Sequence, residues 1–587
     1  MSYYIGIDVG TGSSRVAIID EQGALIELEV ESIKTYNPIH NIYEQSSDNI
    51  WDSICLAVKR ILIKSKIPPE LIKGIGFDAT CSLVVLDQQG QPQSIDPESN
   101  FTNNEWNIIL WADHRALDQA KKINNTHYHQ VLQYVGNTIS PEMQIPKTLW
   151  LKENLPKEKW DKIGHLMDLP DFLTYRATDS LARSTCSLTC KCSYLPRGID
   201  HDENDNDGGG WDAAYFKSIG LECLVEENWE KLGGNSCAQK KKNHNDDRHI
   251  VHYAGDYVGN GLTEKAAMEL GLKKGTPVGS AIIDAYAGAI ATLGASSLQH
   301  QDHDQQNNNS NKLAIICGTS SCHIAMSPHP IFVPGVWGPY HSVLLPKMWC
   351  AEGGQSSTGQ LIDYVLQTHP VIQEATHQAS MKGLTIYAYL NQHLKSLQQK
   401  KGVSHLELLT KKLHIYPDFH GNRSPLADPH LRGSIVGMTL DKSIDDLSLK
   451  YLATLQAIAC QTRHILNSLN ERGYTIDTLC LSGGLCKNEI FVQLQADITG
   501  CKIILPESID AAVVIGAAML GAKAASAISS TSSPSSLWDI MCQLSRAGEI
   551  IYPQKDDLIA QLNNKRYDIF LELLKDQKKY WKMMEED

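Results

Sequence analysis

Two segments of the chain share one pattern of apolar and polar residues. Residues 4–19 (YIGIDVGTGSSRVAII) begin with an apolar run, continue through a small, hydroxyl-rich turn and end in a second apolar run. Residues 313–326 (LAIICGTSSCHIAM) repeat this order. Each segment predicts a strand, a tight turn and a second strand. Because the pattern opens each half of the chain, we expect two related α/β domains that face each other across a cleft.

A third segment, residues 479–488 (LCLSGGLCKN), predicts a strand, a Gly-Gly turn and the start of a helix. Turns made of Gly, Thr and Ser carry no bulky side chains, so their N–H and hydroxyl groups can converge on a phosphate. Adjacent glycines leave room for a purine or a ribose against the backbone. Taken singly, each turn is better explained as an ordinary hairpin or loop, and it is the pairing of turns that favours a phosphate site.

Polar, low-complexity stretches divide the chain. The residues in 201–210, 239–248 and 299–312 include too few apolar side chains to order by burial, so we expect exposed loops there. The third loop separates a predicted first domain, residues 1–296, from a predicted second domain, residues 312–525.

The last part of the chain, residues 526–587, is predicted to be an extension. Ser-rich residues 529–536 indicate a linker. Residues 555–585 carry apolar side chains at mostly helical spacing, which predicts a C-terminal helix.

The composition narrows the class of partner. The 587 residues include 53 Lys and Arg against 67 Asp and Glu, a net charge of −14, without a block of basic residues. Nucleic acid is therefore excluded as the main partner, and an anionic substrate would need locally placed donors. The longest apolar stretch, residues 511–522, is shorter than the ~18 residues that span a bilayer, so we expect no membrane anchor. The 15 scattered cysteines fit a reducing cytoplasm.

The three turns resemble the two phosphate-binding turns and the adenosine motif of the actin-like ATPase fold, in the form found in the FGGY carbohydrate kinases. The likeness covers about residues 3–525. Residues 76–82 (GFDATCS), 110–116 (LWADHRA) and 420–429 (HGNRSPLADP) resemble the ribulokinase branch, most closely the D-ribulokinase-like proteins. The resemblance implies an α/β fold of two actin-like ATPase (ribonuclease H-like) domains around a central cleft.

The same resemblance implies ATP and Mg²⁺ as cofactors. The residues expected to contact ATP are Gly10, Thr11, Gly12, Ser13, Arg15, Gly318, Thr319, Ser320, Gly483, Gly484 and Asn488. Asp8 ends the first strand before the phosphate turn, where a carboxylate can hold Mg²⁺ through water.

Phosphoryl transfer to a sugar hydroxyl needs a base near that hydroxyl. Asp284 is the candidate, because this lone carboxylate ends an apolar run and opens a helix of small residues within residues 279–288 (GSAIIDAYAG). An acid at such a position can also serve only as a helix cap. The position resembles the catalytic Asp of the family, which favours the base.

The sugar site is expected to combine carboxylates with a fixed cation. Glu352 and Lys191 resemble sugar-contacting residues of ribulokinases, and Ala79 matches a backbone contact. With Asp284, the residues predicted to complete this pocket are Asp78, Asp113 and Arg115. An Asp113–Arg115 pair beside Trp111 is equally compatible with a structural ion pair.

These observations predict a kinase that transfers the γ-phosphate of ATP to a pentulose, giving D-ribulose 5-phosphate from D-ribulose. L-ribulose, xylulose or ribitol are alternative substrates, and a non-enzymatic actin-like nucleotide switch is an alternative of another class. The expected partner is a small sugar, and the sequence leaves a homodimer open.

Overall fold

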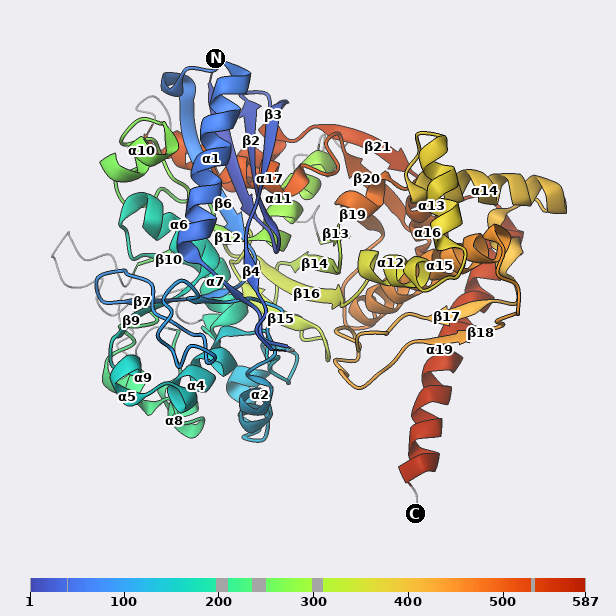
Figure 1. Cartoon of the computed structure of the whole chain (residues 1–587), viewed down its shortest axis with the longest axis horizontal. Helices are drawn as coiled ribbons and strands as arrows, with labels where there is room; N and C mark the ends of the chain where they lie inside the picture. Colours follow the sequence, from blue (N-terminus) through green and yellow to red (C-terminus); the bar gives the residue numbers. More distant parts are fainter. Residues whose placement is uncertain are drawn as a thin grey trace.

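The computed structural model describes residues 2–39, 41–196, 210–234, 250–297, 310–528 and 534–585. The chain forms two lobes, with blue and green elements on the left and yellow and orange ones on the right (Figure 1). The loops predicted over 201–210 and 299–312 and the linker over 529–536 lie largely outside the described residues. The loop predicted over 239–248 lies wholly outside them.

The first sheet of the N-terminal lobe contains the hairpin predicted at its start. β1 (Tyr3–Val9) and β2 (Ser13–Asp20) pair antiparallel, and β3 (Leu25–Ser32) continues the hairpin. β6 (Ile72–Ala79) lies parallel to β1, and β12 (Ile282–Ile283) lies parallel to β6. Because β12, β6 and β1 run in one direction, their carboxyl ends meet at one edge of the sheet.

A second, smaller sheet and a set of helices complete this lobe. The second sheet has the order β4-β5-β8-β7-β9, with bounds β4 (Thr35–Tyr36), β5 (Glu44–Gln45), β7 (Leu83–Asp87), β8 (Ile108–Ile109) and β9 (Ile163–Asp168). The helices and the short β10–β11 pair are α1 (Ser47–Ser65), α2 (Leu117–Asn124), α3 (His129–Leu132), α4 (Gln144–Asn154), α5 (Lys157–Trp160), α6 (Leu169–Thr178), β10 (Arg183–Ser184), α7 (Thr185–Lys191), α8 (Ala213–Ser218), α9 (Glu222–Glu226), β11 (Val251–His252), α10 (Glu264–Leu270) and α11 (Asp284–Ser297).

The C-terminal lobe is built on a sheet with the order β15-β16-β14-β13-β19-β20-β21. Its strands are β13 (Lys312–Cys317), β14 (Ser321–Ser327), β15 (Trp337–His341), β16 (Trp349–Gln355), β19 (Thr478–Ser482), β20 (Lys502–Pro506) and β21 (Ala547–Ile551). β13 and β14 form an antiparallel hairpin, and β19 lies parallel to β13. This arrangement matches that of β1, β2 and β6, so the repeat in the sequence is a repeat in the fold.

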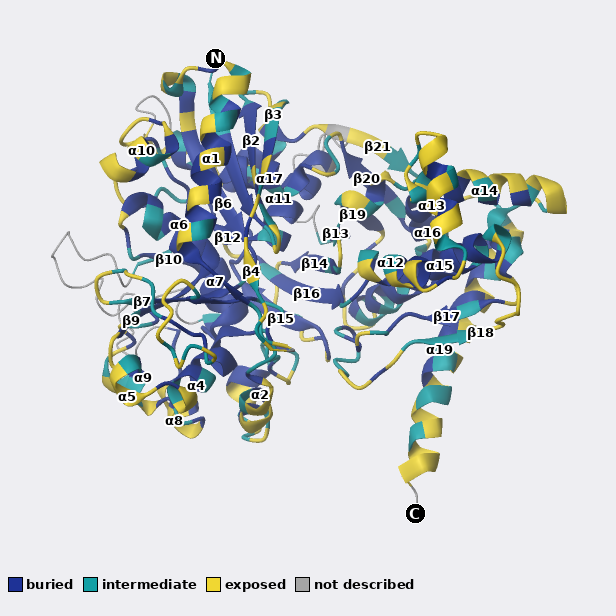
Figure 2. Cartoon of the chain, viewed as in Figure 1, coloured by how far each residue is buried: buried dark blue, intermediate teal, exposed yellow. Residues whose placement is uncertain are grey.

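Helices and a small hairpin surround this sheet. They are α12 (Gly359–Gln367), α13 (Ile372–Met381), α14 (Ile386–Lys401), the 3₁₀ turn η4 (Leu406–Thr410), β17 (His414–Tyr416), β18 (Ser434–Val436), α15 (Ile444–Asn470), the 3₁₀ turn η5 (Gly484–Lys487) and α16 (Glu489–Thr499). The strands of both large sheets are mostly buried, whereas α1, α14 and the end of α19 have exposed faces (Figure 2). The buried apolar residues form one cluster under each large sheet and a further cluster that joins the two lobes.

Helix α17 (Ala512–Ile528) comes from the second half of the sequence but packs against β1, β6 and α11 in the N-terminal lobe (Figure 1). The helix lies unusually close to these strands. A Cβ atom added to Gly6 would lie 1.9 Å from the Val514 carbonyl oxygen, and one added to Gly76 would lie 1.9 Å from that of Ala517. Glycine at these strand positions is therefore what allows α17 to reach the sheet.

The extension after α17 packs first against α11 and α17 and then onto the C-terminal lobe. Helix α18 (Leu537–Leu544) leads to β21, which adds an antiparallel strand beside β20. Helix α19 (Asp557–Glu585) forms where the C-terminal helix was predicted and packs against α15, α16 and β17. Its last turns project away from the lobe (Figure 1). Within the described part of the chain, no helix combines the length and the hydropathy needed to cross a membrane.

Candidate active site

Three carboxylates lie at the edge where β1, β6 and β12 end. Asp8 in β1 pairs in register with Asp78 in β6, and Asp284 follows the last residue of β12. Asp8 and Asp78 are buried, and Asp284 is partly buried at the first position of α11. The Ala285 N–H donates to Asp284 Oδ1 at 2.7 Å, so this carboxylate also caps its own helix.

The environment raises the pKa of each of the three carboxylates. Burial is the main cause for all of them. It raises the pKa of Asp78 well above its usual range, and neither Asp78 oxygen has a hydrogen-bond partner among the described residues. Burial and the charge of Asp8 raise the pKa of Asp284 to about 6. Asp284 is therefore ionised at neutral pH but close to its titration range.

A second cluster centres on Glu352, a buried residue of β16 in the C-terminal lobe. Arg423 Nη2 donates to Glu352 Oε1 at 2.8 Å, and Lys191 Nζ lies 3.6 Å from the same oxygen. The Tyr286 hydroxyl donates to Glu352 Oε2 at 3.2 Å. The two cations also lie over the ring of Trp337, with Lys191 Nζ at 4.6 Å and Arg423 Cζ at 4.3 Å from its centroid. The Glu352 carboxylate is thus fixed in position by groups that donate to it or carry positive charge.

The two clusters are neighbours and come from both lobes. Lys191 ends α7 in the N-terminal lobe, whereas Glu352 belongs to the C-terminal lobe. The charge of Lys191 lowers the pKa of Asp284, and that of Glu352 raises it. Tyr286, two residues after Asp284, reaches Glu352 directly. Ala79, the last residue of β6, is paired with Ile283 and is buried beside the same strand ends.

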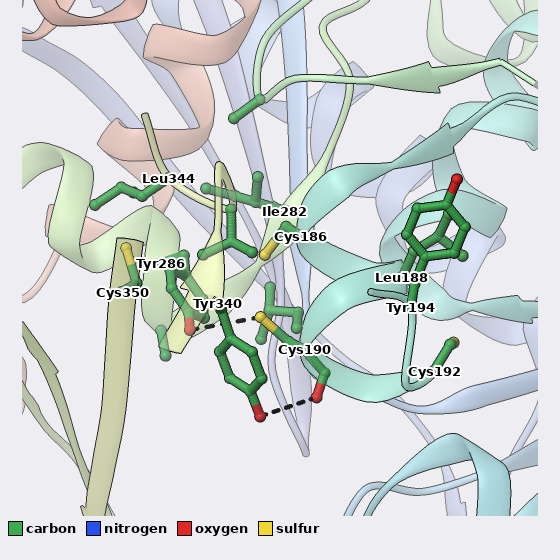
Figure 3. Packing of buried hydrophobic residues seen from close by; sticks show 14 of the residues in the cluster. Cys186, Leu188, Cys190, Cys192, Tyr194, Ile282, Tyr286, Tyr340, Leu344 and Cys350 are labelled. Atoms are coloured by element: carbon green, nitrogen blue, oxygen red, sulfur yellow. Dashed lines mark hydrogen bonds between the residues drawn. The ribbon is translucent and has the colours of Figure 1, made fainter. Parts of the chain in front are cut away.

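An apolar layer that includes the α7 cysteines supports this arrangement (Figure 3). Cys190 Sγ donates to the Tyr286 hydroxyl at 3.5 Å, and the Tyr340 hydroxyl donates to the Cys190 carbonyl at 3.3 Å. Cys186 and Cys190 are fully buried. These contacts couple α7, which carries Lys191, to the helix that begins at Asp284.

Several residues of the cluster were not singled out from the sequence. Arg423 lies within the 420–429 segment that carried the family resemblance, so a signal was present without an assigned role. Glu142 and Trp337 lie in no such motif. Burial raises the pKa of Glu142, but His114, whose Nε2 lies 3.9 Å from Glu142 Oε1, and the charge of Arg423 dominate and hold it at about 2. Glu142 is therefore a second fixed negative charge near Arg423.

The predicted turns are formed and open at their tips. In the first turn the Gly10 N–H donates to the Ser13 carbonyl at 3.0 Å, and Thr11 and Gly12 are exposed. Arg15 follows this turn and forms an ion pair with Asp8 at 3.5 Å.

In the second turn the Gly318 N–H donates to the Ser320 carbonyl at 2.9 Å, and Gly318 and Thr319 are exposed. The Gly-Gly turn lies against this one. Gly483 has a φ of 96°, and a Cβ there would lie 2.4 Å from the Cys317 carbonyl oxygen. Gly484, in contrast, has open space at its Cβ position. The second and third turns are thus adjacent at one edge of the C-terminal sheet.

The side chain of Asn488 makes its contacts within the lobe. Its Oδ1 accepts from the N–H groups of Ile490 and Phe491 at the start of α16, and its Nδ2 donates to the Tyr451 hydroxyl at 2.6 Å. Asn488 is thus the N-cap of α16. Its predicted contact with ATP stays a prediction.

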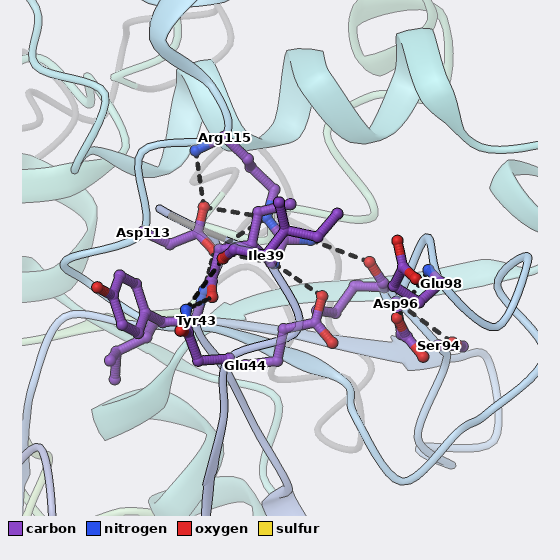
Figure 4. A network of polar contacts seen from close by, with 12 residues as sticks. Ile39, Tyr43, Glu44, Ser94, Asp96, Glu98, Asp113 and Arg115 are labelled. Carbon is purple, nitrogen blue, oxygen red and sulfur yellow. Dashed lines mark hydrogen bonds and ion pairs between the residues drawn. The ribbon is translucent and has the colours of Figure 1, made fainter.

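Asp113 and Arg115 form a buried ion pair (Figure 4). Arg115 Nη2 lies 2.8 Å from both Asp113 Oδ2 and Glu44 Oε1, and both of these side chains are almost fully buried. The Tyr43 N–H donates to Asp113 Oδ2 at 2.7 Å. The structural alternative left open by the sequence accounts for these contacts, so we leave both residues out of the proposed sugar site.

The carboxylates at the strand ends fit a hydrated cation better than a fully protein-coordinated one. Among residues whose positions are described, no group of three or more His, Cys, Asp or Glu side chains is arranged to hold a metal. Asp78 nevertheless has two buried oxygens without a partner, next to Asp8. Mg²⁺ keeps several waters and needs few protein groups, so Asp8 and Asp78 fit it.

The fold defines a class of protein, the one with two actin-like ATPase domains, and solved sugar kinases share it. A xylulose kinase from Rhodospirillum rubrum has this fold, with a TM-score of 0.71 and 17% identity over 98% of this chain and 99% of its own. A gluconate kinase from Lactobacillus acidophilus has a TM-score of 0.72 and 18% identity over 97% of both chains. The predicted fold class is confirmed.

The sequence comparisons are more specific. Residues 3–193 match the N-terminal domain of the FGGY family of carbohydrate kinases, and residues 313–525 match its C-terminal domain. The chain belongs to the FGGY family of carbohydrate kinases, as its motifs indicated, and is a phosphotransferase that acts on a sugar hydroxyl group.

Two relatives are similar over most of the chain. An FGGY carbohydrate kinase domain-containing protein of Xenopus laevis is 46% identical over 99% of this chain and 98% of its own. A D-ribulokinase of Saccharomyces cerevisiae is 42% identical over 89% of this chain and 72% of its own.

Proposed function

We propose that this kinase transfers the γ-phosphate of ATP to a terminal hydroxyl of a pentulose and converts D-ribulose to D-ribulose 5-phosphate. The observation that carries the proposal is the Glu352 carboxylate, fixed by Lys191 and Arg423 in the neighbourhood of Asp284. The choice of sugar is supported by the 42% identity to the yeast D-ribulokinase.

Asp284 acts as the general base in this proposal. As the sugar oxygen attacks phosphorus, it loses its proton, and a carboxylate with a pKa of about 6 can accept that proton at neutral pH. The bond from the Ala285 N–H to Oδ1 leaves Oδ2 for the sugar hydroxyl. The helix cap and the base are therefore two roles of one side chain.

The Glu352 cluster binds the sugar. A carboxylate accepts hydrogen bonds from hydroxyl groups, and the Lys191 ammonium donates to a hydroxyl or carbonyl oxygen. Because both groups are held in place before binding, little side-chain entropy is lost when the sugar enters. The end of β6 at Ala79 offers backbone groups to the same sugar.

ATP is assigned to the exposed tips of the first two turns and to the Gly-Gly turn. Thr11, Arg15 and Thr319 can donate to phosphate oxygens in a chain whose net charge is −14. Asp8, with Asp78 beside it, would hold the waters of Mg²⁺. When bound, Mg²⁺ neutralises phosphate charge that would otherwise repel the nucleophile. Cytoplasmic location and a homodimer stay predictions.

The test is a coupled assay of ADP release across D-ribulose, L-ribulose, D-xylulose, L-xylulose, ribitol, arabitol and glycerol. We expect kcat/KM for D-ribulose to exceed the other values by orders of magnitude, and Asp284→Asn to lower kcat by about 10²–10⁴-fold. If another pentulose stands out instead, the sugar assignment is wrong. If ATP binds but no sugar raises ADP release, the cleft belongs to a nucleotide switch.

A further inference from the structure

A small cavity lies where the C-terminal extension meets the C-terminal lobe, and no residue assigned above to the sugar or ATP sites lines it. It measures about 10 Å³, room for one water-sized particle. His414 in β17, Gln456 and Cys460 in α15, and Arg566 and Phe570 in α19 line it.

Arg566 is a buried cation without a close anionic partner. The residue is 5% exposed, and its Nη2 donates to the Glu407 carbonyl oxygen at 3.2 Å and to Thr410 Oγ1 at 3.1 Å, both neutral groups. No carboxylate of the described residues lies within 4 Å of its guanidinium. A buried guanidinium without a counter-charge is costly, so an anion beside it would stabilise the folded chain.

Two N–H donors at this cavity have no acceptor. Arg566 Nε is buried and lacks a hydrogen-bond partner among the described residues, and so does Gln456 Nε2. The Gln456 side chain is 1% exposed, and its Oε1 already accepts from Thr410 Oγ1 at 2.8 Å. The amide is thereby oriented by Thr410, which leaves its NH₂ group for another acceptor. Buried donors of this kind are ordinarily paired, so their presence at one cavity calls for a ligand that accepts.

The other groups beside the cavity do not supply the missing acceptor. Burial and the charge of Arg566 lower the pKa of His414, so the imidazole is neutral at physiological pH. Burial raises the pKa of Cys460 to about 12, so its thiol is not ionised. Glu407 turns its backbone carbonyl to Arg566, and burial raises the pKa of its carboxyl group.

We propose that this cavity is a binding site for one monatomic anion, chloride, held by the N–H groups of Arg566 and Gln456. The cavity is too small for phosphate or a carboxylic acid. Because Gln456 belongs to α15 and Arg566 to α19, the ion ties the C-terminal helix to the lobe. The site is independent of the proposed sugar and ATP sites.

The first test compares the thermal unfolding of the full chain in sodium chloride and in sodium methanesulfonate at equal ionic strength. A bound chloride raises the unfolding midpoint of this chain by about 1 °C for each tenfold rise in chloride above its dissociation constant. Methanesulfonate, which does not fit the cavity, gives no such rise. Equal midpoints in the two salts would overturn the proposal.

Variants connect this effect to the cavity. Gln456→Glu places a carboxylate beside Arg566, so it is expected to abolish the chloride dependence. In chloride-free buffer its unfolding midpoint should equal that of the chloride-saturated wild type. Arg566→Met removes the cation and also abolishes the dependence. Arg472→Met, at an exposed arginine of the same lobe, is the matched control and keeps it. Retention of the dependence in Gln456→Glu would contradict the assignment.

Crystals of the full chain soaked in sodium bromide give a direct readout. An anomalous peak between Arg566 Nε and Gln456 Nε2 is expected. Density for water only, without anomalous signal, would show that the cavity binds no halide.

Discussion

Asp284 lies where the charges of several buried groups meet, and these charges set its pKa. Burial and Asp8 raise the pKa to about 6, while the N–H of Ala285 and the ammonium of Lys191 limit the rise. A carboxylate poised near neutrality combines a high ionised fraction with a useful proton affinity. Its position is costly for the fold, because desolvation opposes the ionised form that catalysis needs.

The pH dependence of activity follows from this pKa. Below pH 6 the Asp284 carboxylate becomes protonated in the free enzyme, so kcat/KM is expected to fall about tenfold for each pH unit. The measurement is a pH profile of kcat/KM with the best sugar. A flat profile between pH 5 and 7 would contradict the role of Asp284 as base.

The stability of Asp284→Asn should change in the opposite sense to its activity. The folded pKa of about 6 lies above the usual value of about 4, so folding disfavours the ionised group, and stability is lost as the pH rises from 4 through 6. At pH 7 the variant is expected to gain about 3 kcal/mol in free energy of unfolding, and the gain should vanish below pH 4. Urea unfolding at both pH values tests this.

Arg423 is expected to position Glu352. In Arg423→Met the buried Glu352 keeps only Lys191 and Tyr286, and the contact with Trp337 is altered. Breaking a buried charge pair costs about 2–5 kcal/mol, so we expect a large loss of kcat/KM for the sugar. ATP affinity, measured by calorimetry, is the control and should be unchanged. An equal loss of ATP affinity would mean that the lobe has misfolded.

At the scale of single residues, the sequence predicted those that lie in motifs. Asp8, Asp284, Lys191 and Glu352 were found because each follows an apolar run or matches a family segment. Glu142 was missed because it reaches Arg423 only through the packing of distant segments. The choice between a binding role and an ion pair for Arg115 depended on Glu44, 71 residues away in the chain.

At the scale of elements, the packing of α17 on the first sheet depends on missing side chains. Gly6, Gly74 and Gly76 face the helix, and added Cβ atoms would lie 1.9 to 2.0 Å from carbonyl oxygens of Val514, Gly521 and Ala517. The strands and the hairpin turns were predictable because their patterns are local. The position of α17 was not, since close approach of a helix is a property of two surfaces.

A substitution at Gly76 tests this packing. Gly76→Ala forces α17 away from β6, so we expect a loss of about 1–3 kcal/mol in free energy of unfolding. Gly12→Ala is the matched control, because nothing lies within 4 Å of its Cβ position and its φ is not positive. Urea unfolding without ligands compares the two. Equal stability would show that the helix has room to move.

At the scale of the whole molecule, the site is divided between the lobes. Asp284 and Lys191 come from one lobe and Glu352 and Arg423 from the other. A kinase must also exclude water from its phosphoryl group, which closure of two lobes achieves. The two-lobed arrangement was predictable from the repeated hairpin, whereas the exact division of the chain at residues 296 and 312 stays a prediction.

Closure can be measured by small-angle X-ray scattering. The radius of gyration is expected to decrease when D-ribulose and a non-hydrolysable ATP analogue are both present. Each ligand alone is the control and should give a smaller change. An unchanged radius with both ligands bound would count against closure.

The return of α17 to the first sheet also concerns how the protein is made. β1 leaves the ribosome long before the helix that covers it, because about 500 residues separate them and synthesis proceeds at about 5–20 residues per second. The apolar face of the first sheet therefore stays open for on the order of a minute during translation. During that time the helix that covers this face in the folded protein is not yet available. The exposed sheet face is thus a site of possible aggregation until the second lobe is almost complete.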